Sequence, residues 1–242
     1  MVLVKGGRHE KTSSVFRHEA NPKETAMKTL SLAAITALAF LGLANFASGQ
    51  PAQLRVSSDT FNNNDFLPIE AIDNSTVAIS PGSLIFGNEC APNYARGAQN
   101  RSPALSWTNV PPFTDWVSFV VIAFDNSVQV YHWGMYNIPL HIRTLPENAG
   151  VADSNFQQAR NYNKTLGYKG PCPPANEPPL VHDYVFTVYA LRQFISFVEL
   201  PINSDTEALQ RAVTGRVAAQ GSITGRWSST CGQNPLYPCR SQ

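Results

Sequence analysis

Hydrophobic and polar residues alternate with a period of two along much of this 242-residue chain. The segments that show this alternation are rich in β-branched and aromatic residues and are bounded by Pro, Gly and Asn, as strands are. They cover residues 75–87, 116–124, 130–138, 183–191 and 218–227. We therefore predict a strand in each of these segments.

A helical period is well marked once, near the C-terminus. Ser204 and Glu207 have the spacing of a capping box, in which two side chains satisfy free backbone N–H groups of the first turn. The apolar residues of one helical face follow: Ala208, Leu209, Ala212, Val213 and Val217. Strands without regularly alternating helices favour an antiparallel, sandwich-like β domain with a peripheral helix over a doubly wound sheet.

The stretch between Ile142 and Asp183 has almost no strand or helix pattern. Compact domains rarely keep an irregular segment of about forty residues unless it builds a site. Its last part contains GYKGPCPP, residues 167–174, in which three prolines fix φ and two glycines allow close backbone approaches. We expect this stiff loop to present preorganised backbone amides to a small anion, next to the strand that begins at His182.

The N-terminal part of the chain differs from the rest. Its apolar run TLSLAAITALAFLGLANF, residues 29–46, is short for a membrane span and is followed by small residues before Gln50. We interpret residues 27–49 as a signal peptide, residues 1–26 as a non-native upstream extension, and residues 50–242 as a single domain. The mature protein is then secreted or periplasmic. A genuine polar tail before an anchoring helix is the alternative.

Charge gives no indication of a polyanionic partner. Residues 1–49 hold 6 of the 18 Lys and Arg and 3 of the 17 Asp and Glu, which leaves 12 basic and 14 acidic residues and a net charge of −2. Binding to nucleic acid or to an anionic membrane surface would favour a basic excess. We expect no nucleic-acid partner and no integral membrane span in the mature chain.

The chain contains four cysteines, and an oxidising compartment would favour disulfides over metal ligands. Cys231 and Cys239 enclose a short segment of the tail, which leaves Cys90 and Cys172 as the other pair. Four cysteines allow three connectivities, so this pairing is a preference. A zinc site is the alternative, but no Cys-x-x-Cys or His-x-x-x-His spacing supports it.

Five motifs in fixed order carry a resemblance to a known family. They are FNNNDFLP, NRSPALSW, VYHWGMYNIP, GYKGPCPP and HDYVFTVYAL, and the match runs from about Val56 to Trp227. The chain resembles the phosphatidylethanolamine-binding protein (PEBP) family, in particular its bacterial Raf kinase inhibitor-like branch. The resemblance implies a two-sheet Greek-key β fold with peripheral helices, a shallow anion-binding pocket and no cofactor.

The resemblance also implies a set of ligand-binding positions. By their places in the matched motifs, these are Asp125, His132, Gly170, Pro171, His182 and Tyr184. One loop departs from the family pattern: Asp125 begins the sequence DNSVQV, where prolines are missing and Ser127 stands in place of a second acid. Asp183 replaces a basic residue after His182, which we expect to make this side of the site more acidic.

The chemistry of these residues favours a binding protein over an enzyme. Two imidazoles can both donate hydrogen bonds to a phosphate-like or carboxylate oxygen, with Asp125 holding one ring in a donor tautomer. A histidine on an alternating strand can instead be a half-buried structural residue. A hydrolase with Ser127 as nucleophile is a further alternative, although no Gly-x-Ser-x-Gly elbow is present. An inhibitor or interaction partner of a protease or kinase is the remaining one.

Overall fold

The structure is a computed structural model that describes residues 52–78, 86–92, 95–112, 118–152 and 154–237. Short strands dominate, and the elements follow one another in this order: β1 (Ala52–Gln53), β2 (Arg55–Ser57), the 3-10 helix η1 (Ile69–Ala71), β3 (Thr76–Ala78), β4 (Phe86–Asn88), β5 (Leu105–Thr108), β6 (Ser118–Asp125), β7 (Val130–Ile138), β8 (Thr144–Leu145), β9 (Gln157–Ala159), β10 (His182–Leu191), α1 (Thr206–Val213) and β11 (Val217–Trp227). No described helix is long and apolar enough to cross a membrane.

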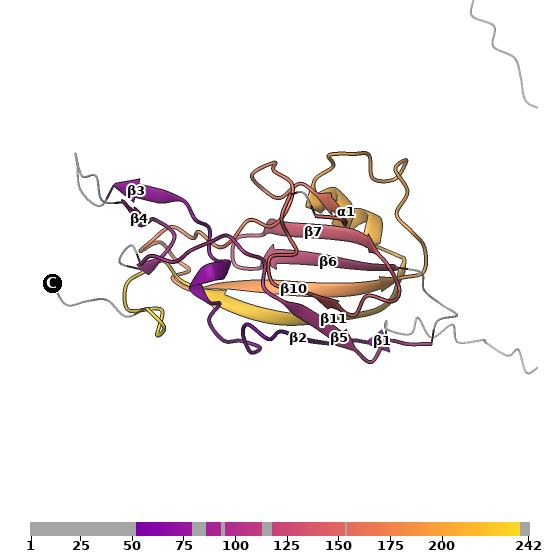
Figure 1. The fold of residues 1–242 in the computed structure, drawn as a ribbon, viewed down its shortest axis with the longest axis horizontal. Coiled ribbons are helices and arrows are strands. Elements are labelled where there is room, and N and C mark those ends of the chain that lie inside the picture. The colour runs from indigo at the N-terminus through magenta and orange to yellow at the C-terminus, as the bar shows by residue number, and fades with distance from the viewer. Residues whose placement is uncertain (1–51, 79–85, 93–94, 113–117, 153, 238–242) are drawn as a thin grey trace, which may run out of the picture. The chain divides into compact units, whose positions relative to one another are not determined.

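The described strands form two sheets and a separate hairpin (Figure 1). The larger sheet has the order β1-β11-β10-β6-β7-β9, and the smaller one has the order β2-β5-β8. Neighbouring strands are antiparallel except β1, which runs parallel to β11. This arrangement is the predicted antiparallel, two-sheet β fold with a peripheral helix near the C-terminus.

Two hydrophobic cores cover the two faces of the larger sheet. The main core lies between the sheets, where the fully buried rings of Trp107 on β5 and Phe119 on β6 meet with their centroids 5.2 Å apart. The second core lies under α1, which buries Leu209 and Val213 against strand residues such as Ile122. Side chains therefore point alternately into the two cores, and β6 is buried along nearly its whole length. The period of two is clearest in β10 and β11, where many alternate residues are half-buried or exposed.

Four predicted strands agree with the structure, and one does not. The predicted strand at residues 130–138 matches β7, and those at 183–191 and 218–227 begin one residue after β10 and β11 begin. The predicted strand at 116–124 corresponds to β6, although residues 116 and 117 lie outside the described part. The single strand at 75–87 was wrong, because β3 and β4 pair antiparallel on either side of a Pro-Gly turn signal.

The helix was predicted correctly, but its boundaries were not. Asp205 is the N-cap and makes no side-chain capping bond, while the Ser204 hydroxyl donates to the Pro201 carbonyl instead. Glu207 pairs with Arg211 one turn further on, with 2.6 Å between Oε1 and Nη1. The predicted capping box therefore does not form. Val217 also lies beyond the helix, at the start of β11.

Candidate functional site

Asp125 and His182 meet at one end of the larger sheet. Asp125 ends β6 and His182 begins the neighbouring strand β10, so the two side chains reach the same face. His182 Nδ1 lies 2.7 Å from Asp125 Oδ2, and both residues are almost completely buried. A buried carboxylate in this position can only accept, so Nδ1 of His182 carries the proton of this hydrogen bond.

A β-bulge in β7 directs His132 toward the same place. Tyr131 pairs with Phe124, and Trp133 pairs with the residue before Phe124, so His132 is an extra residue without a partner on β6. As a result Tyr131 packs against the core under α1, whereas Trp133 lies in the core between the sheets. The bulge places the His132 side chain on the same face of the sheet as Trp133. There the His132 ring contacts Tyr184 edge-on, with 5.1 Å between the ring centroids.

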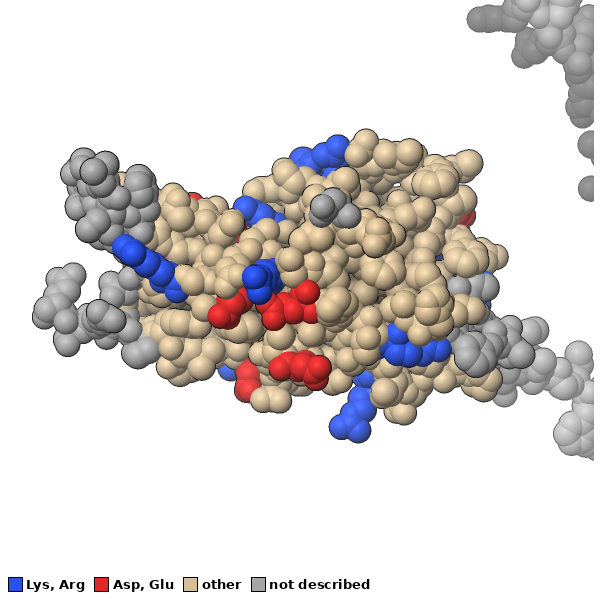
Figure 2. Space-filling model, viewed as in Figure 1, with Lys and Arg blue, Asp and Glu red and all other residues tan. Residues whose placement is uncertain are grey.

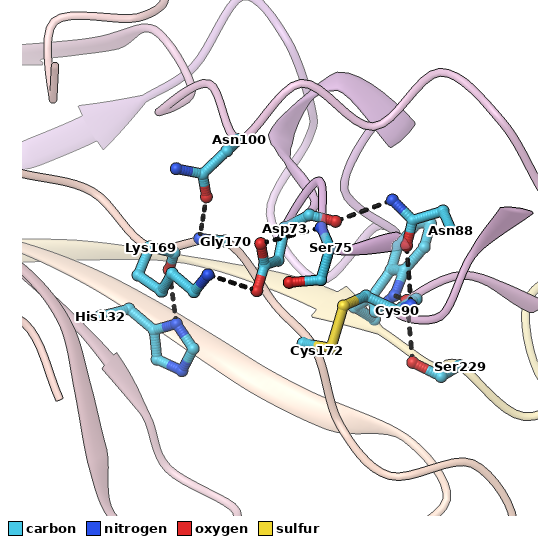
Figure 3. The surroundings of a disulfide bond; sticks show 11 residues. Asp73, Ser75, Asn88, Cys90, Asn100, His132, Lys169, Gly170, Cys172 and Ser229 are labelled. Atoms are coloured by element: carbon cyan, nitrogen blue, oxygen red, sulfur yellow. Dashed lines mark hydrogen bonds and ion pairs between the residues drawn. A yellow bond between two sulfur atoms is a disulfide. The ribbon is translucent and has the colours of Figure 1, made fainter. Parts of the chain in front are cut away.

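His132 is held in the same manner as His182, with a backbone carbonyl in place of the carboxylate. Its Nδ1 lies 2.6 Å from the carbonyl oxygen of Lys169, and the ring is 3% exposed. Figure 3 shows this bond, with the second ring nitrogen directed away from the carbonyl. Since a carbonyl only accepts, Nδ1 of His132 is also a donor.

The second nitrogen of each imidazole is an acceptor whenever the ring is neutral. Nε2 of His132 and Nε2 of His182 have no hydrogen-bond partner among the described residues. Neither atom is fully enclosed by the protein. With Nδ1 protonated, a neutral ring presents a lone pair at Nε2. Asp125 holds one ring, as expected, through Nδ1 of His182. Each Nε2 then becomes a donor only when its ring takes up a second proton.

Burial and charge set the protonation of the site. Burial lowers the pKa of His132 below 6.5, although the bond to Lys169 and the nearby carboxylate of Asp125 oppose this effect. Burial by itself would raise the pKa of Asp125, but the hydrogen bond and charge of His182 outweigh it, so that pKa lies below 3.8. At neutral pH the site therefore combines an ionised carboxylate with a neutral imidazole at His132.

Two tyrosines complete the surroundings of the imidazoles. Tyr184 lies between the two rings, 5.1 Å from the His132 centroid and 6.2 Å from that of His182. Tyr162, which the sequence analysis missed, has its ring centroid 4.8 Å from that of His132. Burial raises the pKa of Tyr162 to about 12, so its hydroxyl remains a neutral donor. Only its place in the irregular stretch between Ile142 and Asp183 connected it with the site.

The loop GYKGPCPP packs tightly against the segment that follows η1. A Cβ on Gly170 would lie 2.4 Å from the Ala71 carbonyl oxygen and 2.4 Å from the Asp73 nitrogen, which leaves no room for a side chain. Gly167 has φ +91°, and a Cβ there would lie 2.3 Å from the Gly150 oxygen. Both glycines therefore serve the close approach and backbone freedom that the sequence indicated.

Three amides of this loop, those of Tyr168, Lys169 and Gly170, are bonded within the protein and are not free for an anion. The N–H of Tyr168 donates to Gly150, and that of Lys169 donates to the His132 carbonyl. The N–H of Gly170 donates to Asn100 Oδ1 at 2.7 Å (Figure 3). Pro171 has no N–H, and its carbonyl accepts from Asp73. The loop positions His132 through the Lys169 carbonyl, and these three amides do not serve as donors to an anion.

A buried ion pair lies beside the loop and was not predicted. Lys169 Nζ is 2.6 Å from Asp73 Oδ2, and the Asp73 side chain is only 4% exposed (Figure 3). Asp73 Oδ1 also accepts from the Ser75 N–H. Lys169 thus fixes His132 through its backbone and neutralises a buried carboxylate through its side chain. No local pattern reveals the pair, because its members are 96 positions apart.

The predicted disulfide between Cys90 and Cys172 is present, and its two ends are 82 positions apart in the sequence (Figure 3). It fastens the loop after Pro171 to the residues that follow β4. Asp73 lies near both sulfur atoms, but sulfurs bonded to each other offer no thiolate ligands to a metal ion. Cys231 is also disulfide-bonded, and its predicted partner, Cys239, lies outside the described residues.

Hydrogen bonds replace the missing prolines of the DNSVQV turn. The Asn126 N–H donates to the Asp183 carbonyl, and the Asp183 N–H donates to Ser127 Oγ. Asp125 Oδ1 accepts from the Ser127 N–H at 2.9 Å. The turn is therefore tied to the start of β10. The Asp183 side chain, which we expected to acidify the site, is exposed on the opposite face from His182 and lies 3.8 Å from Arg226.

These features define a class of protein: a mainly antiparallel, two-sheet β domain with a buried pair of imidazoles and a disulfide-fastened loop at one end of the larger sheet. The family model described as "Phosphatidylethanolamine-binding protein" matches residues 57–228. The chain therefore belongs to the phosphatidylethanolamine-binding protein family.

Individual relatives agree with this assignment. The chain is 33% identical over 136 residues to a UPF0098 protein of Methanothermobacter thermautotrophicus, which covers 54% of this chain and 85% of that protein. It is 34% identical over 116 residues to the UPF0098 protein YbcL of Escherichia coli, covering 44% and 59% respectively.

Two crystal structures share the fold at low sequence identity. E. coli YbcL, described as a member of the mammalian PEBP family, matches with a TM-score of 0.55 and 24% identity over 73% of this chain and 99% of that one. A PEBP homolog from Chlamydia trachomatis matches with a TM-score of 0.51 and 24% identity, covering 73% and 97%.

Proposed function

We propose that this chain is a secreted or periplasmic binding protein that holds a small phosphate- or carboxylate-bearing anion, such as a phospholipid headgroup, at His132 and His182. One observation carries the proposal: both imidazoles reach the same end of the sheet with Nδ1 held by the protein and Nε2 left without a partner. The signal-like segment 27–49 and the disulfide support an oxidising compartment outside the cytosol.

Anion binding at this site is coupled to proton uptake. Each neutral ring presents a lone pair, which repels an anionic oxygen, whereas a protonated ring donates a charge-assisted hydrogen bond. The anion therefore binds as the rings gain protons, and it stabilises them in turn. Tyr162 adds a neutral donor beside His132, and the Asp73–Lys169 pair keeps its own charges balanced.

The geometry supports binding without catalysis. A serine nucleophile needs a base within hydrogen-bond reach. Ser127 is the candidate nucleophile, but its Oγ accepts the N–H of Asp183, and no bond joins it to either His132 or His182 among the described residues. In this proposal the hydrogen-bonded pair of Asp125 and His182 therefore binds the anion without catalysing a reaction.

Calorimetric titration of the parent protein and of His132→Ala, His182→Ala and His141→Ala tests the proposal. The probes are sulfate, acetate and phosphoethanolamine at pH 5.5 and pH 8. Loss of one charge-assisted bond should weaken binding by about 1.5–3 kcal/mol, or roughly tenfold to a hundredfold. His141 is exposed and lies outside the site, so its variant is the control.

Stronger binding at pH 5.5 that fails in the first two variants and persists in the third supports the anion site. Equal affinities in all four folded proteins would refute it. If the folded parent binds none of the probes, the protein is better explained as an interaction partner of a protease or kinase.

A further inference from the structure

The segment between β10 and α1 exposes an unusual group of apolar side chains. Phe194 is 58% exposed, Phe197 60%, Val198 91% and Ile202 74%. These are the four most exposed large hydrophobic residues of the described part of the chain, and all fall within nine positions. Single exposed apolar residues are common, but a contiguous group marks an interaction surface. We call these four residues the apolar tip.

The apolar tip stands on a rigid base. Ile195 and Leu200 alternate with the exposed residues and are buried, at 3% and 1% exposure, in the core under α1. Asn137 at the end of β7 clamps the segment from both sides, because its Nδ2 donates to the Ile195 carbonyl at 2.9 Å and its Oδ1 accepts the Ile195 N–H at 3.0 Å. The exposed side chains are therefore held outward by the fold.

The charged groups in the segment are largely neutralised within it. The Glu199 carboxylate accepts from the Ser196 N–H and hydroxyl at 3.0 and 2.9 Å and pairs with Arg216. Arg192, at the start of the segment, forms no ion pair among the described residues. The rim of the apolar tip thus carries a free cation and a carboxylate that is already paired, which suits a surface that meets lipid headgroups.

The apolar tip lies at the end of the larger sheet where the chain enters the domain. The segment follows Leu191, which pairs with Val217, and Ala52 pairs with Ala219 two residues further along β11. His182 is at the other end of β10, opposite Trp227. Figure 1 accordingly shows β1 and the arrowhead of β10 at the same end of the sheet.

The sequence before Ala52 suggests what this end faces. The apolar run of residues 29–46 is joined to Ala52 by only five residues, 47–51. A bilayer that holds this run, before cleavage or as an anchor, is connected through this short segment to Ala52, at the end of the sheet that carries the apolar tip.

We propose that the apolar tip docks on a phospholipid bilayer, with Phe194, Phe197, Val198 and Ile202 inserted at the boundary of headgroups and acyl chains. Docking at this end leaves the imidazole site at the opposite end of the sheet facing away from the membrane. Binding arises mainly from apolar burial, because the domain has no basic excess, so neutral and anionic bilayers should bind within a few-fold of each other.

The test uses the chain from Gln50 onward, because residues 48–242 form a compact unit of their own. Sedimentation with phosphatidylcholine vesicles, alone or with phosphatidylglycerol, measures the partition of the parent, of the double variant Phe194→Ser/Phe197→Ser and of Leu236→Ser. Leu236 is 53% exposed and lies near Arg226, at the imidazole end of β11, so it is a matched control. The double variant should lose at least about tenfold in partition, and the control should keep it.

A double variant of His132→Ala and His182→Ala separates docking from the anion site, and it should bind vesicles as the parent does. Loss of vesicle binding in that variant would show capture through headgroups at the imidazoles and would overturn the proposal. Equal partition of all variants, or no binding by the parent, would also overturn it. The proposal would also be overturned if the parent does not bind vesicles but self-associates in sedimentation velocity, and the double variant Phe194→Ser/Phe197→Ser does not self-associate.

Discussion

Apolar residues are usually buried and polar residues exposed, and the two ends of the larger sheet depart from this rule in opposite ways. At one end, the polar groups of Asp125, His132 and His182 are buried. At the other end, Phe197 and Val198 are exposed on a segment whose backbone is firmly held. Between them the strands follow the rule and alternate between two cores.

The difference shows which kind of partner each end can serve. Burying polar groups carries a cost that hydrogen bonds inside the protein offset, so a buried polar cluster is stable only if it is tightly supported. The imidazole end accordingly has a disulfide, a buried ion pair and a bulge. Exposed apolar groups need only be held in place, and one asparagine clamp does this at the apolar tip. Figure 2 shows small, separate acidic and basic groups on the visible face, with no large field of one sign.

Removal of the disulfide should show most strongly how much support the imidazole end needs. The Cys90→Ala/Cys172→Ala variant releases a closed loop of 82 residues, which by chain entropy should cost about 4–5 kcal/mol of unfolding free energy. Urea unfolding measures the loss. The parent in reducing buffer should show at least the same loss. A variant as stable as the parent would mean that the loop is held by its hydrogen bonds alone.

The buried ion pair should have the next largest effect. Lys169→Met leaves the Asp73 carboxylate buried without its cation and should cost about 3 kcal/mol of unfolding free energy. Lys164→Met is the matched control, because the Lys164–Asp205 pair is exposed and should contribute less than about 1 kcal/mol. Similar losses in the two variants would contradict the distinction between a supported interior and a solvated surface.

The clamp of the apolar tip comes third. Asn137→Ala removes both hydrogen bonds to Ile195 and leaves an alanine at φ +54°, so it should cost about 2 kcal/mol. Hydrogen exchange should accelerate locally between residues 192 and 202 and remain unchanged in β10. If exchange increases equally throughout the sheet, the segment is not a separately held unit.

The pH dependence of stability should be the smallest effect. The folded pKa of His132 is lowered below 6.5 by burial, so the unfolded chain binds more protons and the protein loses stability as pH falls below about 6.5. The slope from this residue is at most about 1.4 kcal/mol per pH unit. Urea unfolding between pH 5 and 8 should give a smaller slope for His132→Gln than for His141→Gln. Identical slopes would contradict a neutral buried imidazole.

The sequence predicted those parts of the fold that depend on local pattern. The alternation of β10 and β11 was clear because many alternate residues are half-buried or exposed. β6 and β7 were recognisable from their β-branched and aromatic residues, which pack against cores on both faces. The 75–87 segment was misassigned because period alone does not show where a chain reverses. The capping box does not form, because Asp205 is the N-cap of the helix and the Ser204 hydroxyl donates to the Pro201 carbonyl.

The site was predicted in its residues but not in its chemistry. Family motifs named Asp125, His132 and His182, and the structure brings them together. Whether Nε2 of a neutral imidazole donates or accepts depends on which group bonds to Nδ1. The Lys169 carbonyl that bonds to His132 Nδ1 is 37 residues away. The loop amides were expected to be donors to an anion. The sequence could not show that the Gly170 amide is bonded to Asn100, because Asn100 is 70 positions away. Such long-range partners leave no local signal.

Proton uptake on anion binding tests the account of the imidazole end most directly. Sulfate keeps its charge between pH 6 and 8, so any protons taken up enter the protein. Calorimetric titration at pH 7.5 in two buffers with different ionisation enthalpies should give an uptake of at least about one proton per sulfate bound, because burial keeps the His132 ring neutral before sulfate binds. The uptake should fall by about one in His132→Ala. Sulfate binding without proton uptake would show that the rings already donate from Nε2, which would contradict the arrangement described for this site.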